Sequence, residues 1–509
     1  MADKIFIKQI DVNAPVETVF GWHEKPGAFE RLTPPWMKLK NIHKSGKGID
    51  AGTTLNMDIC FANIPFSIKA EHIDYEKNRL FKDRLYGGIF SKWEHTHRFL
   101  PLGTLASDSE QSGICSMNNG ISRLEDRIDY ALPFHIPDKW HDLIRAEMYR
   151  LFNYRHNVMV NDLDRHRSSE LQISSELRNG DNTPKSLTIL ISGASGPVGN
   201  ALVPFLTTGG HRVIKLVRQT PKNGDEIYWN PYTRELNLEQ ALKTELTASN
   251  NSKSADKDRL SSKIDVVINL NGYNIGAGRW TEKIKELIIK SRTLSTSLIA
   301  EKISSLPLNL RPELFISASA TGFYGNSGDS CLDENSTSGE LFISKVCREW
   351  EKCGQQVEEC GIRTVFPRIG VVLTPAGGVL ERLLPGFMMG LGAKIGSGEQ
   401  YMSWISIDDL VYALNHIIND KSIHGVVNAT SPNPVRNSDF TQILAKAMSR
   451  PAPFTLPASL IQMVWGEMGK ELLLSSTRVL PKRLINSGFR FSHPTLEQAF
   501  RHLIGTTAE

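Results

Sequence analysis

The feature that most constrains the fold is a glycine-rich turn placed between an apolar strand and a helix. The strand covers residues 187–191, the turn reads GASGPVG, and a second apolar strand ends at Val217 after the helix stops at Gly209-Gly210. This order predicts a βαβ unit of a parallel sheet. Because glycine lacks Cβ, such a turn lets the backbone bend sharply and approach a pyrophosphate at the helix N-terminus. The pattern favours a dinucleotide site over a glycine-rich turn without a ligand. The expected cofactor contacts are Gly193, Ala194, Ser195, Gly196, Pro197, Val198 and Gly199.

The residues after the second strand indicate which dinucleotide binds. A site that prefers NAD carries an Asp or Glu there to bind the ribose hydroxyls. This chain has Arg218 directly after Val217, with Lys222 close behind. A cation at this place favours a 2′-phosphate, so NADP(H) is expected rather than NAD(H). The alternative is that Arg218 is a solvated residue at the end of the strand.

Two further strands end in small polar residues, at the edge of the sheet where Rossmann ligands bind. The strand at 264–270 ends in a turn that can pass backbone close to both halves of the cofactor. The expected contacts there are Asn269, Leu270, Asn271 and Gly272. The strand at 314–316 is followed by Ser319 and Tyr324, whose hydroxyls suit a proton relay that polarises a carbonyl. Alternatively, these small residues cap a strand and a turn.

Other polar residues lie where a substrate would contact the protein. Arg368 is expected beside the cofactor and, with Arg279-Trp280, as a wall for an anionic or aromatic substrate; Trp280 fits the core equally well. Asp408 or Asp409 is expected to cap a helix rather than to act in catalysis.

No metal site is expected. Cys347, Cys353 and Cys360 have spacings unlike paired CxxC ligands and fall on a helix-like stretch, where they fit buried apolar positions. His95 and His97 point to one face of a strand, but the sequence identifies no third ligand.

The first third of the chain predicts a different, α+β unit. Short runs with period-two alternation are separated by Gly, Pro and Asn, a helix follows Pro15, and a long helix covers about 139–166. A curved antiparallel sheet closed over the long helix would bury both apolar faces. The polar stretch 168–185 is expected to be a linker, and the polar stretch 244–263 a surface insertion.

Composition is typical of a folded cytoplasmic protein of two or more domains. The 509 residues are 40% hydrophobic, and a formal charge of +4 gives no reason to expect nucleic acid as a partner. Six cysteines are too few for a disulfide-stapled scaffold. Neither a signal peptide nor an uncharged apolar run long enough to span a membrane occurs, so we expect no membrane anchor.

Two resemblances follow from these motifs. The segments SKWEHTHRF, LEDRIDYALPF and FNYRHNVMVNDLDRH resemble the helix-grip (SRPBCC) superfamily of START, polyketide-cyclase and Bet v 1-like proteins, which implies a cavity for a hydrophobic ligand within residues 1–167. The segments GASGPVG, ISASATGFYGNSGD, VCREWE and NATSPNPVRNSDFT resemble the atypical, extended short-chain dehydrogenase/reductases of the epimerase family, of YfcH and SDR39U1 type. This second resemblance implies an NADP(H)-binding Rossmann domain over 186–456, a C-terminal extension over 457–509 that completes a substrate lobe, and a small-molecule substrate of unassigned identity. The expected fold is a doubly wound parallel α/β Rossmann domain preceded by an α+β helix-grip domain.

One departure from the wider superfamily affects the mechanism. Those enzymes place a Tyr four residues before a Lys on one helix, where the Lys lowers the phenol pKa and the Tyr acts as acid and base. Here Lys345 is present, but the position four before it is Leu341. As an NADP(H)-dependent oxidoreductase or epimerase-like enzyme, the chain would use Ser319 to polarise the reacting oxygen, Tyr324 to offer a proton and Lys345 to hold ribose hydroxyls. The alternative is a non-catalytic NADP(H)-binding sensor.

Overall fold

Two compact units make up the structure, a computed structural model that describes residues 4–46, 48–61, 64–104, 120–133, 138–176, 186–238 and 263–506. One unit consists mainly of Met1–Arg167, the other mainly of Ser168–Leu206 and Gly210–Ile504. Within the described ranges, no helix is both long and apolar enough to cross a membrane. The insertion predicted at 244–263 lies outside the described residues, apart from Lys263.

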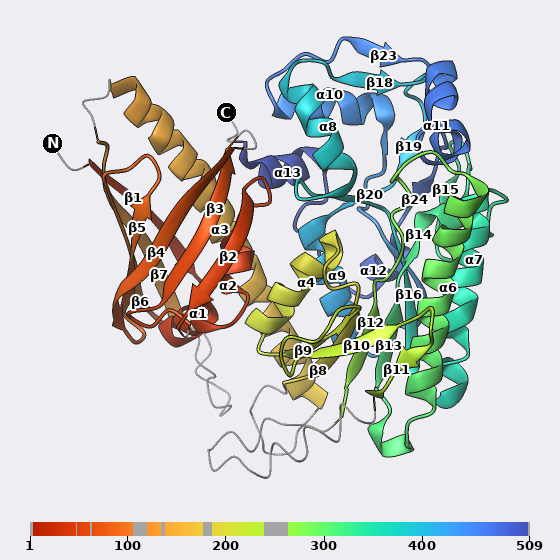
Figure 1. Cartoon of the computed structure of the whole chain (residues 1–509), viewed down its shortest axis with the longest axis horizontal. Helices are drawn as coiled ribbons and strands as arrows, with labels where there is room; N and C mark the ends of the chain where they lie inside the picture. Colours follow the sequence, from red (N-terminus) through yellow and green to blue (C-terminus); the bar gives the residue numbers. More distant parts are fainter. Residues whose placement is uncertain are drawn as a thin grey trace, which may run out of the picture. The chain divides into compact units, whose positions relative to one another are not determined.

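The first unit is built on a seven-stranded antiparallel sheet with strand order β1-β7-β6-β5-β4-β3-β2 (Figure 1). Period-two alternation produces it: along β7, buried Leu124, Asp126 and Ile128 alternate with less buried neighbours. The sequence pattern did not predict β2, because nearly all of its side chains are exposed and give no apolar alternation. The strands are β1 Lys4–Val12, β2 Lys38–Ser45, β3 Thr54–Phe61, β4 Ile64–Glu76, β5 Leu80–Gly87, β6 Lys92–Thr104 and β7 Gly120–Ala131.

Among the described residues of this unit, the helices are α1 Val16–Glu24, α2 Ala28–Leu32 and α3 Asp138–Glu176. The single helix expected after Pro15 is two helices, because Lys25, which precedes Pro26, is extended and Gly27 adopts a left-handed φ of 95°. The helix α3 continues to Glu176, so the first part of the predicted linker is its last turns, and residues 177–185 lie outside the described ranges. An antiparallel sheet with a long helix agrees with the predicted helix-grip architecture, while membership of that superfamily stays a prediction.

The second unit contains the predicted parallel Rossmann-like sheet. Its parallel strands run in the order β10-β9-β8-β12-β13-β16-β21, and the direction of strand addition reverses between β8 and β12. Such a reversal is the hallmark of a doubly wound sheet and marks the edge where ligands bind. The strands are β8 Thr188–Ser192, β9 Arg212–Val217, β10 Glu226–Asn230, β11 Glu235–Leu236, β12 Val266–Asn269, β13 Leu314–Ser317, β14 Ser319–Ala320, β16 Arg363–Ile369 and β21 Gly425–Ala429.

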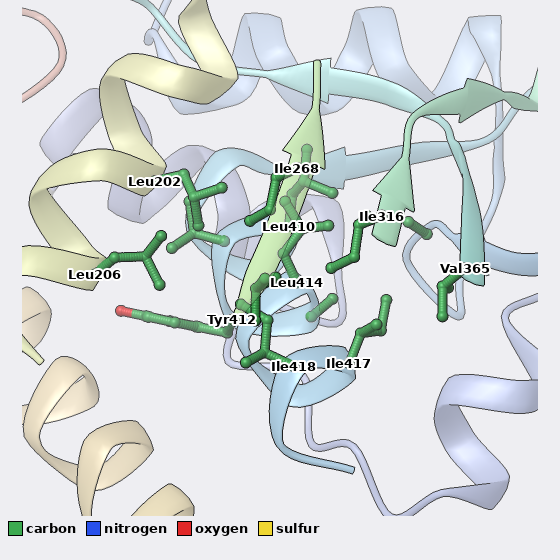
Figure 2. Close-up of a cluster of buried hydrophobic side chains, with 14 of the residues drawn as sticks. Leu202, Leu206, Ile268, Ile316, Val365, Leu410, Tyr412, Leu414, Ile417 and Ile418 are labelled. Carbon is green, nitrogen blue, oxygen red and sulfur yellow. The ribbon is translucent and has the colours of Figure 1, made fainter. Parts of the chain in front are cut away.

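Helices cover both faces of this sheet. On one face, apolar side chains of α4 (Pro197–Thr208) and α9 (Ile407–Asn419) pack on the strands. Figure 2 shows the labelled members of this cluster: Leu202, Leu206, Ile268, Ile316, Val365, Leu410, Tyr412, Leu414, Ile417 and Ile418. On the other face, α6 (Glu282–Ser304) buries Leu298, Ile299 and Ile303 against the sheet, and α7 (Phe342–Gln355) lies beside α6.

The remaining α-helices and short strand pairs of the described residues follow β16 in the sequence, except for β15. The helices are α8 Gly378–Met388, α10 Asn437–Ala447, α11 Ala458–Leu472, α12 Lys482–Asn486 and α13 Leu496–Phe500. The strand pairs are β15 Cys331–Leu332 with β24 Arg478–Val479, β17 Val371–Leu373 with β20 Trp404–Ser406, β18 Ala393–Ile395 with β23 Phe454–Leu456, and β19 Tyr401–Met402 with β22 Val435–Arg436.

The structure shows which residue caps α9 and where Trp280 lies. The helix α9 is capped by Ser406, whose side chain accepts from the backbone of Asp409, so the prediction that Asp408 or Asp409 provides the cap is wrong. Asp409 instead accepts from the backbone N–H groups of Ser492 and His493, which fixes the C-terminal segment to α9. Trp280 is a core residue, buried among apolar side chains.

Candidate functional site

The glycine-rich turn forms a close-packed cradle between β8 and α4. Gly193 has a φ of 74°, and a Cβ there would lie 2.8 Å from the carbonyl carbon of Leu270 at the end of β12. A Cβ on Gly199 would lie 2.5 Å from the carbonyl oxygen of Gly193. Both positions therefore exclude any side chain. The turn brings the start of α4 against the strand end at which a dinucleotide would lie.

The cradle also leaves hydrogen-bond donors available. Gly196 N–H donates to the Gly193 carbonyl at 3.0 Å, which closes the turn. In contrast, the backbone N–H groups of Ser195, Val198 and Gly199 donate no hydrogen bond to any residue that the structure describes. The first N–H groups of a helix lack partners within the helix and carry its positive end. This arrangement fits a pyrophosphate group.

Arg218 directly follows β9, the strand next to β8. Its side chain is exposed and makes no ion pair or hydrogen bond within the described part of the chain. A cation at this strand end is free to meet an anionic group on a ligand, as the sequence predicts.

The turn after β12 is fixed by hydrogen bonds to its own surroundings. Asn269 is fully buried; its side chain accepts from Ser192 Oγ at 2.6 Å and donates to Thr296 Oγ1 at 2.8 Å. Asn271 donates from Nδ2 to the carbonyl of Ser291 on α6 at 3.2 Å. Leu270 faces the cradle through its backbone, so this turn presents main chain rather than the Asn269 side chain. Gly272 packs against the guanidinium of Arg292, where a Cβ would lie 3.1 Å from Cζ.

Three predicted site residues meet in one buried network. Ser319 Oγ donates to Glu351 Oε1 at 2.6 Å, and Arg368 forms a two-point pair with the same carboxylate, Nε to Oε1 at 2.8 Å and Nη2 to Oε2 at 2.9 Å. Arg368 Nη1 also donates to Tyr324 Oη at 3.0 Å, and its guanidinium lies 3.3 Å from the centre of the Phe323 ring. All three nitrogens of Arg368 are thereby used within the protein.

Tyr324 ends this network on the opposite side. Its hydroxyl donates to Asn428 Oδ1 on β21 at 2.7 Å. Burial raises the pKa of Tyr324 above its ordinary value, and the neighbouring Arg368 offsets only part of the shift. Tyr324 therefore keeps its proton at neutral pH and can act as a donor rather than as a base.

Lys345 is not part of this network. It lies in the first turn of α7 with 61% of its side chain exposed, and its Nζ is 3.8 Å from Glu349. Leu341, four residues earlier, is the N-cap residue of α7 and brings no hydroxyl group to the site. The structure thus brings Ser319, Tyr324 and Arg368 together and leaves Lys345 apart from them.

Sequence reasoning missed Glu351, which joins Ser319 to Arg368. A signal was present, because Ile343, Val346, Cys347 and Trp350 form an apolar stripe at helical spacing, and Glu351 falls on that stripe. A carboxylate on a buried face requires a cation as its partner. The same stripe accounts for Cys347, which is buried and whose thiol pKa is raised by burial to about 12, as expected of an unreactive core thiol.

Comparisons with known proteins agree with this fold. Residues 189–429 match the family described as "NAD dependent epimerase/dehydratase family", and residues 456–503 match "Domain of unknown function (DUF1731)". Epimerase family protein Mb2239 of Mycobacterium bovis is 37% identical over 311 residues, which are 61% of this chain and 95% of the relative. The human epimerase family protein SDR39U1 is 32% identical over 321 residues, 62% of this chain and 100% of the relative.

Solved structures extend the comparison to the first unit. The nucleoside-diphosphate sugar epimerase from Corynebacterium glutamicum covers 98% of this chain and 90% of its own, with a TM-score of 0.71 and 28% identity. The human SDR39U1 structure with NADPH covers 62% of this chain and 99% of its own, with a TM-score of 0.52 and 28% identity. Neither matched family reaches residues before 189, so the N-terminal unit carries no assignment from them. With nearly the whole length of these relatives represented in its second unit, the chain belongs to the epimerase family.

Proposed function

We propose that this protein binds NADP(H) at the glycine cradle and acts on a small molecule as an oxidoreductase or epimerase-like enzyme. The observation that carries the proposal is a set of three backbone N–H groups in the glycine turn and the first turn of α4, those of Ser195, Val198 and Gly199, which donate to no residue in the described ranges. The human relative SDR39U1, which covers the second unit, was crystallised with NADPH. When bound, the nucleotide would supply or accept a hydride.

The chain's own residues would divide the remaining work. The N–H groups of Ser195, Val198 and Gly199 would hold the pyrophosphate, and Arg218 would pair with the 2′-phosphate. Ser319 would polarise the reacting oxygen, and Tyr324, whose oxygen accepts a hydrogen bond from Arg368, would offer its own proton directly to the substrate. Lys345 would bind ribose hydroxyls from the start of α7. The limits 1–167, 186–456 and 457–509 stay our proposed domain boundaries.

Calorimetric titration of the full chain with NADPH and NADH, repeated for Arg218→Ala, tests the nucleotide preference. A charge-assisted pair with phosphate contributes about 1.5–3 kcal/mol, so the variant should lose about tenfold or more of its NADPH affinity. NADH lacks the phosphate and therefore serves as the matched control, with unchanged affinity. Equal loss for both nucleotides, or for neither, would remove Arg218 from the site.

A non-catalytic NADP(H)-responsive sensor is the second candidate, and one observation favours it. The hydroxyls of Ser319 and Tyr324 already donate to Glu351 and Asn428, and Lys345 stands outside that network. If the protein is an enzyme, Ser319→Ala should abolish NADPH oxidation with carbonyl or nucleotide-sugar substrates while leaving nucleotide affinity within a few fold. If it is a sensor, no substrate supports turnover, and a hydrophobic ligand of the N-terminal unit changes NADPH affinity reciprocally.

A further inference from the structure

A group of histidine and aspartate side chains lies inside the N-terminal unit. Asp83 on β5 is directly opposite His95 on β6, and His97 on β6 is directly opposite Asp126 on β7. Because directly opposed residues of antiparallel strands share a face, three strands deliver these four side chains to one place. His95, His97 and Asp126 are buried, and the side chain of Asp83 is 16% exposed.

Asp83, His95 and His97 have the spacing of ligands around one ion. Asp83 Oδ2 lies 3.4 Å from His95 Nδ1 and 3.6 Å from His97 Nε2, and the ligand atoms offered by the three residues lie within 4.8 Å of one another. Metal bonds of about 2.0–2.2 Å in a tetrahedral site place neighbouring ligand atoms about 3.3–3.6 Å apart. Hydrogen bonds between the same atoms would be shorter, at about 2.7–3.2 Å.

Asp126 holds both imidazoles from the other side. Its Oδ1 lies 2.8 Å from His95 Nε2 and 2.7 Å from His97 Nδ1, while its Oδ2 lies 2.6 Å from Nε2 of His156 on α3. Each of the two strand histidines thus turns one nitrogen toward Asp126 and the other toward Asp83. A carboxylate behind a histidine is the usual partner that orients a metal-binding imidazole.

The competing explanation is a cluster that satisfies itself through hydrogen bonds alone. Asp126 fits that explanation, but Asp83 does not. Its carboxylate is mostly buried, and the two imidazole nitrogens nearest to it lie at 3.4 Å and 3.6 Å, longer than the roughly 2.7–3.2 Å of a well-formed hydrogen bond. Asp83 therefore has the geometry of a metal ligand.

We propose that Asp83, His95 and His97 bind one divalent transition-metal ion of the zinc type inside the N-terminal unit. Three protein ligands leave a fourth tetrahedral position open for water or a small ligand, as in catalytic rather than structural zinc sites. The sequence could not identify the third ligand, because Asp83 lies on a different strand from the histidine pair and only the register of β5 with β6 brings it opposite His95.

Cobalt(II) is the probe for the test, because it takes the place of zinc and absorbs visible light strongly only in a tetrahedral field. The full chain, freed of metal with a chelator, is titrated with Co²⁺ and then with Zn²⁺. We expect a saturable tetrahedral spectrum at one equivalent per chain, which zinc then displaces. A failure to saturate at one equivalent, or a weak octahedral spectrum, would overturn the proposal, and this measurement requires no variant.

Two substitutions of Asp83 then test whether this residue is a ligand. Asp83→Asn keeps the shape of the side chain and removes the anionic ligand, so cobalt affinity should fall about tenfold or more. Asp83→His offers a nitrogen ligand in its place and should restore the tetrahedral spectrum. Asp58→Asn, which changes an exposed carboxylate on β3 of the same sheet, is the matched control and should bind like the unmodified chain. Unchanged binding in Asp83→Asn would show that the ion sits elsewhere.

Discussion

The pair formed by Arg368 and Glu351 gives the sharpest prediction about the second unit. Both side chains are nearly inaccessible, at 5% and 7% exposed. Glu351→Gln keeps the volume of the side chain but leaves the Arg368 guanidinium buried without a counter-charge. Removing one partner of a buried ion pair costs about 3–5 kcal/mol, because an uncompensated charge stays in the interior. The free energy of unfolding of the second unit should fall by about that amount.

Glu349→Gln is the matched control, since it makes the same substitution on the same helix two residues earlier. Glu349 is 39% exposed and faces the exposed Lys345 at 3.8 Å, so its ion pair is screened by water. Exposed pairs of this kind contribute less than about 1 kcal/mol. The difference between the two variants isolates the effect of burial from the effect of changing a glutamate on α7.

Differential scanning calorimetry of the full chain measures both variants. At about 2 °C per kcal/mol for a unit of this size, Glu351→Gln should lower the midpoint of the second unit's transition by about 6–10 °C. Glu349→Gln should lower it by less than about 2 °C. Equal midpoints for the two variants would refute the reasoning, since they would mean that Arg368 finds solvent or another partner once Glu351 is neutral.

Three further predictions concern other parts of the chain. Gly193→Ala places a Cβ 2.8 Å from the carbonyl carbon of Leu270 at a residue with a left-handed φ, so the turn must distort. Calorimetric titration should then show at least about a tenfold loss of NADPH affinity, and an unchanged affinity would contradict the proposal that this turn holds the nucleotide. Burial lowers the pKa of His23 to about 4, below its unfolded value of 6.5, so its contribution to stability is complete above pH 6.5 and is lost as pH falls toward 4. Between pH 7 and pH 5 this loss is about 2 kcal/mol, so urea titrations should show a flatter dependence of stability on pH for His23→Leu than for the unmodified chain. The pKa of the neighbouring His97 is shifted upward, which changes stability with pH in the opposite direction in both proteins. The test is therefore the difference between the pH profiles of the variant and the unmodified chain. Asp409→Ala removes the acceptor of the hydrogen bonds that the backbone N–H groups of Ser492 and His493 donate, so thermal denaturation should show a free energy of unfolding lower by about 2 kcal/mol or more. An unchanged stability would mean that the C-terminal segment is held by its apolar contacts alone.

Periodicity and turn chemistry were sufficient to predict most of the architecture. The glycine turn between two apolar runs identified the βαβ unit, and the alternation at Lys4–Val12 and Gly120–Ala131 identified strands that prove to be neighbours in the first sheet. The exposed strand Lys38–Ser45 was not predicted from the sequence, because a strand without a buried face shows no alternation of apolar and polar residues. The Pro26-Gly27 pair divided a predicted helix into two.

The candidate sites were less predictable, because side-chain partners depend on register between elements far apart in sequence. Ser319 and Tyr324 could be singled out by their place after a strand. Their connection through Arg368 and Glu351 depends on how α7 packs against β16, which no local pattern encodes. Likewise, His95 and His97 were visible as a pair, but Asp83 becomes their neighbour only through the alignment of β5 with β6.

The packing around Gly199 has a consequence for how such turns are compared between proteins. Its missing Cβ makes room for the carbonyl of Gly193, a neighbour within the same turn, rather than for anything outside the protein. Selection for a stable turn would therefore retain this glycine in a descendant that had stopped binding any nucleotide. A glycine fingerprint alone thus indicates the ancestry of a chain, whereas substitution at an exposed position such as Arg218 would be the earlier sign of a lost cofactor.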